Sequence, residues 1–370
     1  MTSLQRLPAL LTPLDVALDA LLNGLQPVAP VEVALEEARG CIAARSAPPA
    51  AIPSHDVAAA DGFALHARDL VGASSYSPLP LMSAPVWVEA GDAMPSGCDC
   101  VVDADSVDVS GPIAQVVAEA VPGQGVRRAG SDLAASESVT MQGRRILTRD
   151  LLIARAAGLT ELRVRRPRLR IVNIPGGRLT ADLIAESAHQ AGAEVNAVAA
   201  TARDAASIAA ALDTGTSDLL ISVGGSGVGR SDEAVMALAG QGEVLVHGIA
   251  LQPGRTAAIG RIGKTPVVAL PGAPDHAIAA WWTLALPALD RLSGRLPRKT
   301  IRLPLARKVA SSVGLAEVVL LTCMDGAWIT LAVGELSLQA IARAKAWLTV
   351  PGGSEGFAAG TPVDARLIEE

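Results

Sequence analysis

Between residues 167 and 294, short apolar runs alternate regularly with segments of helical spacing. The runs RLRIVNI, DLLISVGG and TPVVALPG are too short for helices and rich in branched aliphatic residues, whereas TADLIAESAHQAG and SDEAVMALAG carry apolar residues at helical intervals. Alternation of this kind predicts a parallel sheet covered by helices, with a ligand crevice at the carboxyl ends of its strands.

A glycine-rich loop lies at that predicted edge. The stretch SDLLISVGGSGVGRSDEAV, residues 217–235, joins a buried-type strand at 219–223 to a helix. Such a turn presents backbone N–H groups and the positive end of a helix to an anion. The spacing fits neither the dinucleotide fingerprint, whose last glycine would fall at Arg230, nor a P-loop, which needs a following Lys-Ser/Thr pair. The loop either binds an anion in another way or only permits a tight turn, with Ser231 or Asp232 capping the helix.

The flanking segments predict three further parts. TPLDVALDALLNG, residues 12–24, predicts a helix with Thr12 as N-cap and Pro13 in its first turn, and PVEVALEEARGCIAA, residues 30–44, predicts a second helix. TRDLLIARAAGLT, residues 148–160, predicts a third helix that stops at Gly158. Short apolar runs punctuated by Gly and Pro predict β structure before and after these segments. The predicted parts are a helical linker domain (1–45 and 141–166), an inserted mostly β domain (46–140), an α/β domain (167–296) and a C-terminal β domain (297–370).

Composition narrows the class of protein. A chain of 370 residues with 50% hydrophobic residues can bury several cores. Its net charge of −6 and its two Phe, five Trp and one Tyr argue against nucleic acid as a partner, because nucleic-acid binding commonly uses basic surfaces and aromatic stacking. No stretch approaches the ~18 uncharged apolar residues of a membrane span. We therefore expect a cytoplasmic protein that does not bind a membrane.

Seven segments, taken together, resemble the motifs of one family in order. They are DVAAADGFAL (56–65), EAGDAMPSGCDCVV (89–102), GVRRAGSDL (125–133), DLLISVGGSGVGRSD (218–232), HGIALQPGR (247–255), VVALPGAPDHAI (267–278) and KAWLTVPGGSEGFAAGTPV (345–363). The family is that of the molybdopterin molybdenumtransferases, which includes MoeA and the gephyrin E domain. The resemblance implies a multidomain α/β plus β fold in which the α/β domain binds molybdopterin, and a homodimer whose site combines that domain with the inserted domain of the other subunit.

The resemblance also implies a reaction and a set of site residues. Family members insert molybdenum from molybdate into adenylylated molybdopterin with Mg²⁺-dependent release of AMP. Carried over position by position, the candidates for the chemistry are Asp61, Asp132, Asp232 and, at a position where the family differs, Arg178, with Asp232 also the candidate metal ligand. The candidates for contact with the pterin are Gly224, Gly225, Ser226, Gly227, Gly229, Arg255, Pro271, Gly272 and Pro274. Each acid also has a structural interpretation: Asp61 shapes a turn, Asp132 is a solvated loop acid and Asp232 is a helix cap.

The sequence departs from the family at the metal-binding motif. Where the family has Thr-Gly-Asp-Glu-Leu, this chain reads NIPGGRL, so Gly177 and Arg178 stand in place of the two acids. A charge pair at ~4 Å is worth about 4 kcal/mol at an effective dielectric constant of about 20. A cation in place of a carboxylate should therefore prevent the usual Mg²⁺ arrangement, and the guanidinium of Arg178 is expected to grip ligand oxygens instead.

Three functions remain open from the sequence. The first is insertion of molybdenum into molybdopterin, or a related step, by a rearranged site, in which case a molybdoenzyme apoprotein or another cofactor-assembly protein is an expected partner. The second is a non-catalytic carrier of molybdopterin or of the finished cofactor, which the loss of the Asp-Glu pair favours. The third is generic binding of a phosphate ligand by the glycine loop.

Overall fold

The sheet expected between residues 167 and 294 has six strands, four of them parallel. A computed structural model of the chain describes residues 5–368. The sheet has the order β14-β13-β15-β19-β18-β16. Its strands are β13 (Arg168–Asn173), β14 (Glu194–Ala199), β15 (Leu219–Val223), β16 (Glu243–His247), β18 (Ala258–Ile262) and β19 (Thr265–Leu270).

The expected parallel arrangement holds for β14, β13, β15 and β19. The expectation did not include the two antiparallel strands β18 and β16 at the other edge. β18 pairs antiparallel with β19 because only two residues, one of them Gly263 with φ +59°, join them, and a connection that short permits only a hairpin. β16 then pairs antiparallel with β18. The parallel part of the sheet is the part whose carboxyl ends meet the glycine loop.

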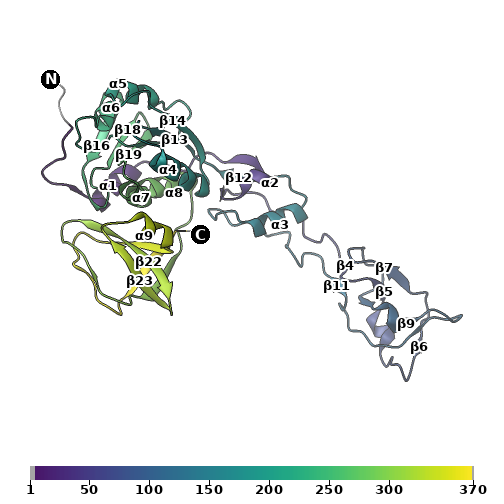
Figure 1. Cartoon of the computed structure of the whole chain (residues 1–370). Helices are drawn as coiled ribbons and strands as arrows, with labels where there is room; N and C mark the ends of the chain where they lie inside the picture. Colours follow the sequence, from purple (N-terminus) through teal and green to yellow (C-terminus); the bar gives the residue numbers. More distant parts are fainter. Residues whose placement is uncertain (1–4, 369–370) are drawn as a thin grey trace. The chain divides into compact units, whose positions relative to one another are not determined.

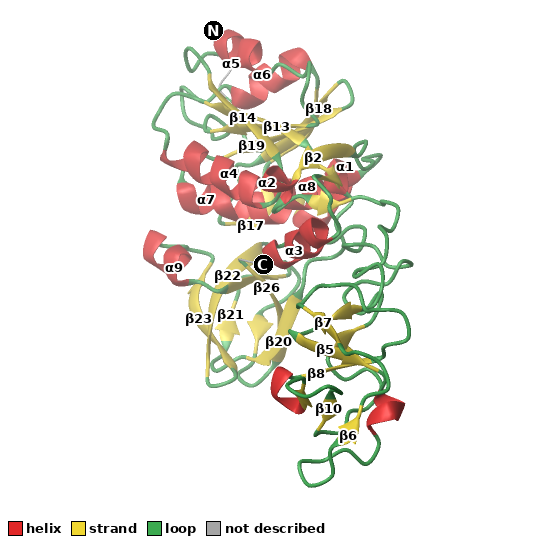
Figure 2. Ribbon diagram, turned by 90° about the vertical axis from the view of Figure 1, so that its right-hand side faces the viewer, coloured by secondary structure: helices red, strands yellow, loops and turns green. Residues whose placement is uncertain are grey.

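Helices cover both faces of this sheet (Figures 1 and 2). One face packs on α5 (Ala205–Ala211) and α6 (Ala234–Gln241). The other face forms the largest core and packs on α1 (Leu14–Leu22), α4 (Leu179–Gln190), α7 (Pro274–Ala280), the π-helical stretch η3 (Trp281–Ala285) and α8 (Leu286–Ser293). All five residues of β15 are buried, as expected for a central strand covered on both faces.

A second sheet draws strands from three distant parts of the chain. Its order is β1-β17-β22-β24-β26-β20, and β23 pairs with β22. The strands are β1 (Thr12–Pro13), β17 (Ile249–Gln252), β20 (Thr300–Pro304), β22 (Ala316–Met324), β23 (Ala327–Val333), β24 (Ala346–Val350) and β26 (Pro362–Leu367). The helix α9 (Leu338–Arg343) lies between β23 and β24 in the sequence, and β21 (Val309–Ala310) pairs with β25 (Gly356–Phe357).

Two helix predictions were wrong in part. Thr12 does not cap α1: Thr12 and Pro13 form β1, parallel to Ile249 and Ala250, and the helix begins at Leu14. In residues 30–44 only α2 (Leu35–Ala38) is helical, because Val31 and Val33 alternate with polar or small neighbours, which suits the strand β2 (Val31–Ala34). The strand β2 belongs to a three-stranded sheet with β12 (Glu161–Arg165) and β3 (Ile42–Ala43). The linker is therefore less helical than expected.

The chain divides into two structural units. Unit 1 contains the residues up to 44, residues 142–146 and those from 163 onward, and unit 2 contains residues 45–141 and 147–162. Unit 2 is mostly β, with α3 (Thr148–Ala156) and the 3₁₀ turns η1 (Ala67–Leu70) and η2 (Ala104–Ser106). Its strands are β4 (Val57–Ala58), β5 (Gly62–Leu65), β6 (Leu79–Pro80), β7 (Val86–Val88), β8 (Cys100–Val102), β9 (Val107–Asp108), β10 (Gln115–Val116) and β11 (Val126–Arg127).

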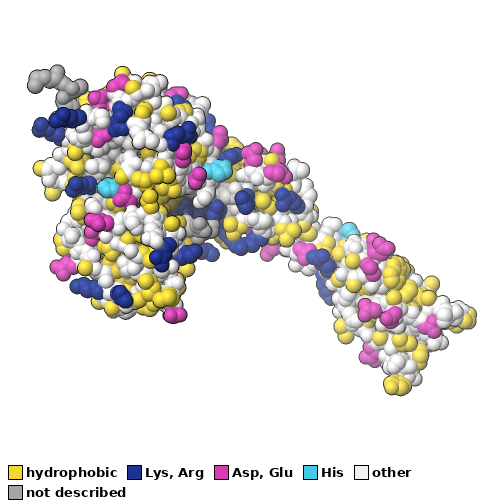
Figure 3. Space-filling view, in the orientation of Figure 1, with side chains coloured by type: hydrophobic (Ala, Val, Ile, Leu, Met, Phe, Trp, Pro, Cys, Tyr) yellow, Lys and Arg dark blue, Asp and Glu magenta, His cyan; other side chains and the backbone are white. Residues whose placement is uncertain are grey.

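The charged surface and the helices can be compared with the expectation that the protein binds neither nucleic acid nor a membrane. Acidic and basic side chains are interspersed on the face of the molecule that Figure 3 shows. Within residues 5–368, no helix combines the length and the apolar character that crossing a membrane requires.

Candidate functional site

The carboxyl ends of β13, β15 and β19 open into one cavity of about 490 Å³, here called the loop cavity. Its walls come from the turns after these three strands, from the first residues of α4 and α7, and from Arg203 and Thr256. Seven of the residues predicted from the sequence line it: Gly224, Gly225, Gly227, Asp232, Pro271, Gly272 and Pro274. Segments almost 100 residues apart in the chain are joined here, because the Thr180 hydroxyl at the start of α4 donates a hydrogen bond to the Gly272 carbonyl at 2.6 Å.

The glycine loop is a tight turn whose backbone forms a wall of the loop cavity. Gly224 and Gly225 have φ values of +94° and +66°, which side-chain-bearing residues rarely adopt. A Cβ atom on Gly225 would also lie 3.1 Å from Cδ1 of Ile174. The helix α6 starts at Ala234 with Glu233 in the cap position, so the alternative in which Ser231 or Asp232 caps the helix was wrong.

Asp232 turns back into the loop instead of capping α6. Its Oδ2 accepts a hydrogen bond from the Gly229 N–H at 2.9 Å, and its side chain is only 18% exposed. A Cβ atom on Gly227 would lie 2.5 Å from Asp232 Oδ2, and one on Gly229 would lie 2.9 Å from it. Glycine at 227 and 229 thus makes room for the carboxylate.

The sequence reasoning missed Arg203, which is the ion-pair partner of Asp232. Its Nη2 donates to Asp232 Oδ1 at 3.0 Å, and its Nη1 donates to the Pro175 carbonyl. Arg203 follows β14, so it reaches the same sheet edge as the glycine loop. One signal in the sequence pointed to it: a basic residue between the end of a predicted strand and Asp204, the N-cap of α5.

Three predicted pterin-contacting residues do not line the loop cavity. Ser226 is fully buried behind the loop, and its Oγ has no hydrogen-bond partner among the described residues. The Gly229 N–H donates a hydrogen bond to the Asp232 carboxylate. The Arg255 side chain is exposed to solvent. Gly229 therefore contributes to the site by holding the Asp232 carboxylate in place, and not by lining the cavity.

Arg178 also lies outside the lining of the loop cavity. Its side chain is 80% exposed and pairs with Asp182 of α4 at 3.3 Å. It lines a separate small cavity of about 100 Å³ together with Asn173 and residues of β14. The lining cation of the loop cavity is thus Arg203, whereas the sequence departure pointed to Arg178.

Asp61 and Asp132 belong to unit 2 and have partners there. Asp61 Oδ1 accepts a hydrogen bond from the Ala90 N–H at 2.8 Å, which suits an acid that shapes a turn. Asp132 pairs with Arg127 and is partly exposed. Their proposed part in the site stays a prediction.

Two side chains hold the glycine loop from behind. The buried Gln5 donates through Nε2 to the Gly225 and Gly227 carbonyls, and its Oε1 accepts from the Val235 N–H at 3.1 Å. His247 Nε2 lies 3.0 Å from the Ser226 carbonyl, and burial lowers the pKa of this imidazole below its ordinary value. A neutral His247 with the proton on Nε2 donates this hydrogen bond.

The loop cavity does not fit the Mg²⁺ ion that the family resemblance implies. Both carboxylate oxygens of Asp232 are already hydrogen-bonded, one of them to a cation. Gly177 lines the cavity at the position of one family acid, and no group of three His, Cys, Asp or Glu residues within residues 5–368 has metal-binding geometry. Since Mg²⁺ requires oxygen ligands, these residues do not provide a Mg²⁺ site.

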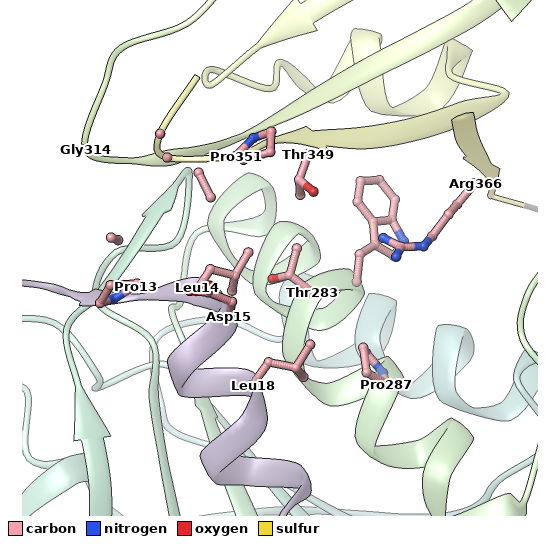
Figure 4. Close-up of a pocket in the computed structure, with 15 residues that line it drawn as sticks. Pro13, Leu14, Asp15, Leu18, Thr283, Pro287, Gly314, Thr349, Pro351 and Arg366 are labelled. Carbon is pink, nitrogen blue, oxygen red and sulfur yellow. The ribbon is translucent and has the colours of Figure 1, made fainter. Parts of the chain in front are cut away.

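A larger cavity, of about 550 Å³, lies in another part of unit 1 (Figure 4). Leu14, Asp15 and Leu18 of α1, Thr283 of η3 and Pro287 of α8 form one side, and residues at the ends of β24 and β26 form the other. None of the residues proposed for the chemistry lines it. Size alone therefore does not identify the site in this molecule.

Comparison with known proteins fits this geometry. Residues 12–158 match the model of the MoeA N-terminal region (domain I and II), and residues 179–291 match that of a probable molybdopterin binding domain. Molybdopterin molybdenumtransferase 2 of Mycobacterium tuberculosis (strain H37Rv) is 30% identical over 307 residues, which span 72% of this chain and 76% of that protein. The chain belongs to the molybdopterin molybdenumtransferase family.

Further members support the assignment and the fold. Molybdopterin molybdenumtransferase of Synechococcus elongatus is 28% identical over 377 residues, 90% of this chain and 93% of that protein. The crystal structure of the molybdopterin biosynthesis MoeA protein of Pyrococcus horikoshii superposes with a TM-score of 0.76 at 23% identity and covers 97% of this chain and all of that one. The fold of this member of the family is thus MoeA-like, a multidomain α/β plus β architecture, as the sequence predicted.

Proposed function

We propose that this protein acts in molybdenum cofactor biosynthesis and binds molybdopterin in the loop cavity. One observation carries the proposal: seven residues chosen from the sequence as pterin or catalytic candidates line a single cavity at the carboxyl edge of the parallel strands. That edge is where open α/β sheets bind ligands. The segment also falls in the range that matches a probable molybdopterin binding domain.

The proposed reaction is transfer of molybdenum from molybdate to the dithiolene of molybdopterin, with adenylylated molybdopterin as the expected form of the substrate. The chain's own residues would bind and orient the reactants. Gly224 and Gly225 let the backbone approach the ligand closely, while Gly272 and Pro274 form the opposite wall. Relatives named as transferases support this reaction over a carrier that only binds the pterin.

We further propose a cytoplasmic homodimer that serves a molybdoenzyme apoprotein. In such a dimer, Asp61 and Asp132 of the partner subunit would complete the site around the loop cavity. This assignment rests on the family resemblance of the segments 56–65 and 125–133. Of the other candidates, Asp232 contributes to the cavity through its ion pair with Arg203, whereas Arg178, Ser226 and Arg255 do not line it.

Mass spectrometry of ligand co-purified with the protein from a molybdopterin-producing host tests the proposal. Molybdopterin or its adenylylated form in the wild-type protein is the expected result. Finished cofactor bound without any transfer of molybdenum in a reconstitution assay would favour the carrier. Absence of every pterin, together with no binding of purified molybdopterin, would contradict the proposed function.

A further inference from the structure

The loop cavity contains one cation and one anion. Among the described residues that line it, only Arg203 and Asp232 carry a formal charge when His276 is neutral. They pair at 3.0 Å, so the carboxylate is neutralised by a side chain of the same subunit. A bare Asp232 would instead repel an anionic ligand across the cavity.

Arg203 retains hydrogen-bonding capacity beyond this pair. A guanidinium has five N–H donors. One donates to Asp232 and one to the Pro175 carbonyl, and the buried Nε–H has no partner among the described residues. The second hydrogen of each terminal nitrogen is not used by any described acceptor either. The side chain is 37% exposed and lines the cavity, so the unused hydrogens on its two terminal nitrogens can reach a ligand, whereas Nε is buried.

Several residues hold the guanidinium group of Arg203 in place. Asp232 and the Pro175 carbonyl fix the two terminal nitrogens, and a Cβ atom on Gly176 would lie only 2.9 Å from Nη1. Glycine at 176 therefore leaves the space that the guanidinium occupies. A fork held in this way loses little conformational entropy when it binds, so its orientation favours recognition of a planar or tetrahedral oxyanion.

We propose that Arg203, positioned by Asp232, is the cation that binds an oxyanion in the loop cavity and that it replaces a divalent metal ion there. The ligand chemistry is a tetrahedral oxyanion, supplied either by a phosphate ester or by molybdate. The location rests on the proposed function, because the loop cavity is the proposed pterin site. Binding of the oxyanion then needs no Mg²⁺.

Equilibrium dialysis of the full chain against inorganic molybdate and, separately, against inorganic phosphate tests this inference. Each is measured with EDTA and with excess Mg²⁺, and the two anions distinguish the two sources of the oxyanion. The wild-type protein should bind at least one of them equally in both buffers. Arg203→Ala should weaken that binding by about tenfold or more in EDTA, the range for loss of charge-assisted hydrogen bonds. Mg²⁺ should restore part of the affinity, because the variant leaves Asp232 without a cation.

Three further variants separate the role of Arg203 from those of other cations and from loss of folding. Arg230→Ala removes a positive charge from an exposed position of the same loop outside the cavity lining, and it should bind like the wild type. Arg203→Gln keeps most of the side-chain length without the charge and should lose affinity as Arg203→Ala does, which covers the case that the alanine variant is unstable. Binding within twofold of the wild type in both Arg203 variants, or wild-type binding that requires Mg²⁺, would overturn the inference. A loss in Arg178→Ala alone would assign the role to Arg178 instead.

Failure of this inference and failure of the proposed function give different results. If purified molybdopterin does not bind the wild-type protein but molybdate or phosphate binds in an Arg203-dependent way, the proposed function fails and the inference stands. If molybdopterin binds and neither Arg203 variant changes binding of any of the three ligands, the inference fails and the proposed function stands.

Discussion

Gly227 shows how one absent side chain shapes the site. The carboxylate of Asp232 occupies the space that a Cβ atom on Gly227 would need, and the same carboxylate orients Arg203. The requirement for glycine here is a close approach, which differs from the positive φ that Gly224 and Gly225 need. The loop therefore needs glycine for two reasons: a backbone conformation with positive φ at some positions, and space for a neighbouring carboxylate at others.

Gly227→Ala should displace the Asp232 carboxylate and break its ion pair with Arg203. We expect oxyanion affinity to fall several-fold and the free energy of unfolding to fall by about 0.5 to 1.5 kcal/mol, because a displaced Asp232 loses hydrogen bonds at this partly exposed position. Gly240→Ala is the matched control, because Gly240 lies in α6 with no atom near its Cβ position. That variant should be neutral or stabilised by about 0.5 to 1 kcal/mol. Equal thermal stability and affinity in both variants would rule out the steric role of Gly227.

His247 should make the stability of unit 1 depend on pH. Burial lowers the pKa of His247 below its ordinary value of 6.5 in the folded protein. As the pH falls below about 6.5, the unfolded chain binds a proton that the folded chain still excludes, so the free energy of unfolding decreases. Above that pH the effect vanishes.

Urea denaturation between pH 7 and pH 5 measures this dependence. The wild type should lose stability more steeply than His247→Gln, whose amide cannot be protonated in this range. His189→Gln, which changes an exposed histidine of α4, should keep the wild-type slope. If His247→Gln and the wild type have the same slope, the burial of His247 does not control the acid response.

At the scale of elements, the glycine loop depends on the segment before α1. Gln5 bonds two loop carbonyls and the Val235 N–H near the start of α6, so it ties the N-terminal segment to both ends of the loop. Gln5→Ala should leave these buried groups unpaired and cost about 1 to 3 kcal/mol. Hydrogen exchange at residues 224–235 should become faster in this variant, while exchange in β22 stays unchanged. Unchanged exchange in the loop would show that Gln5 is not an anchor.

Elements with a strong local pattern were predicted well from the sequence. The buried strand β15 and the alternation around it fixed the parallel layer, because a central strand is apolar on both faces. The strand β2 was predicted as helix, since four residues of alternating pattern next to a short helix look like one amphipathic segment. The Arg203–Asp232 pair could not be derived, because it depends on which strand lies beside which, and β14 and β15 both neighbour β13 only in the folded sheet. The family motifs predicted the glycine and proline residues that line the cavity, but Arg203 lies outside all of these motifs.

At the scale of the whole molecule, the proposed homodimer makes a further prediction. If Asp61 and Asp132 act on the loop cavity of the partner subunit, Asp61→Ala and Gly227→Ala damage different halves of a shared site. Each variant alone should transfer molybdenum more slowly than the wild type, and co-expression of the two should restore part of the activity through mixed dimers that hold one intact site. Sedimentation should show a dimer at micromolar concentration. A stable monomer, or no recovery on co-expression of two folded variants, would remove the shared-site arrangement.

The pairing of β1 with β17 affects how the chain can fold while it is being translated. Thr12 and Pro13 are synthesised more than 230 residues before their partners Ile249 and Ala250. The last strand of the same sheet, β26, ends only at Leu367. The sheet therefore cannot close before residue 367 has emerged from the ribosome. Until then the segment around β1 lacks its pairing partners, and chaperones that shield nascent apolar segments can bind it.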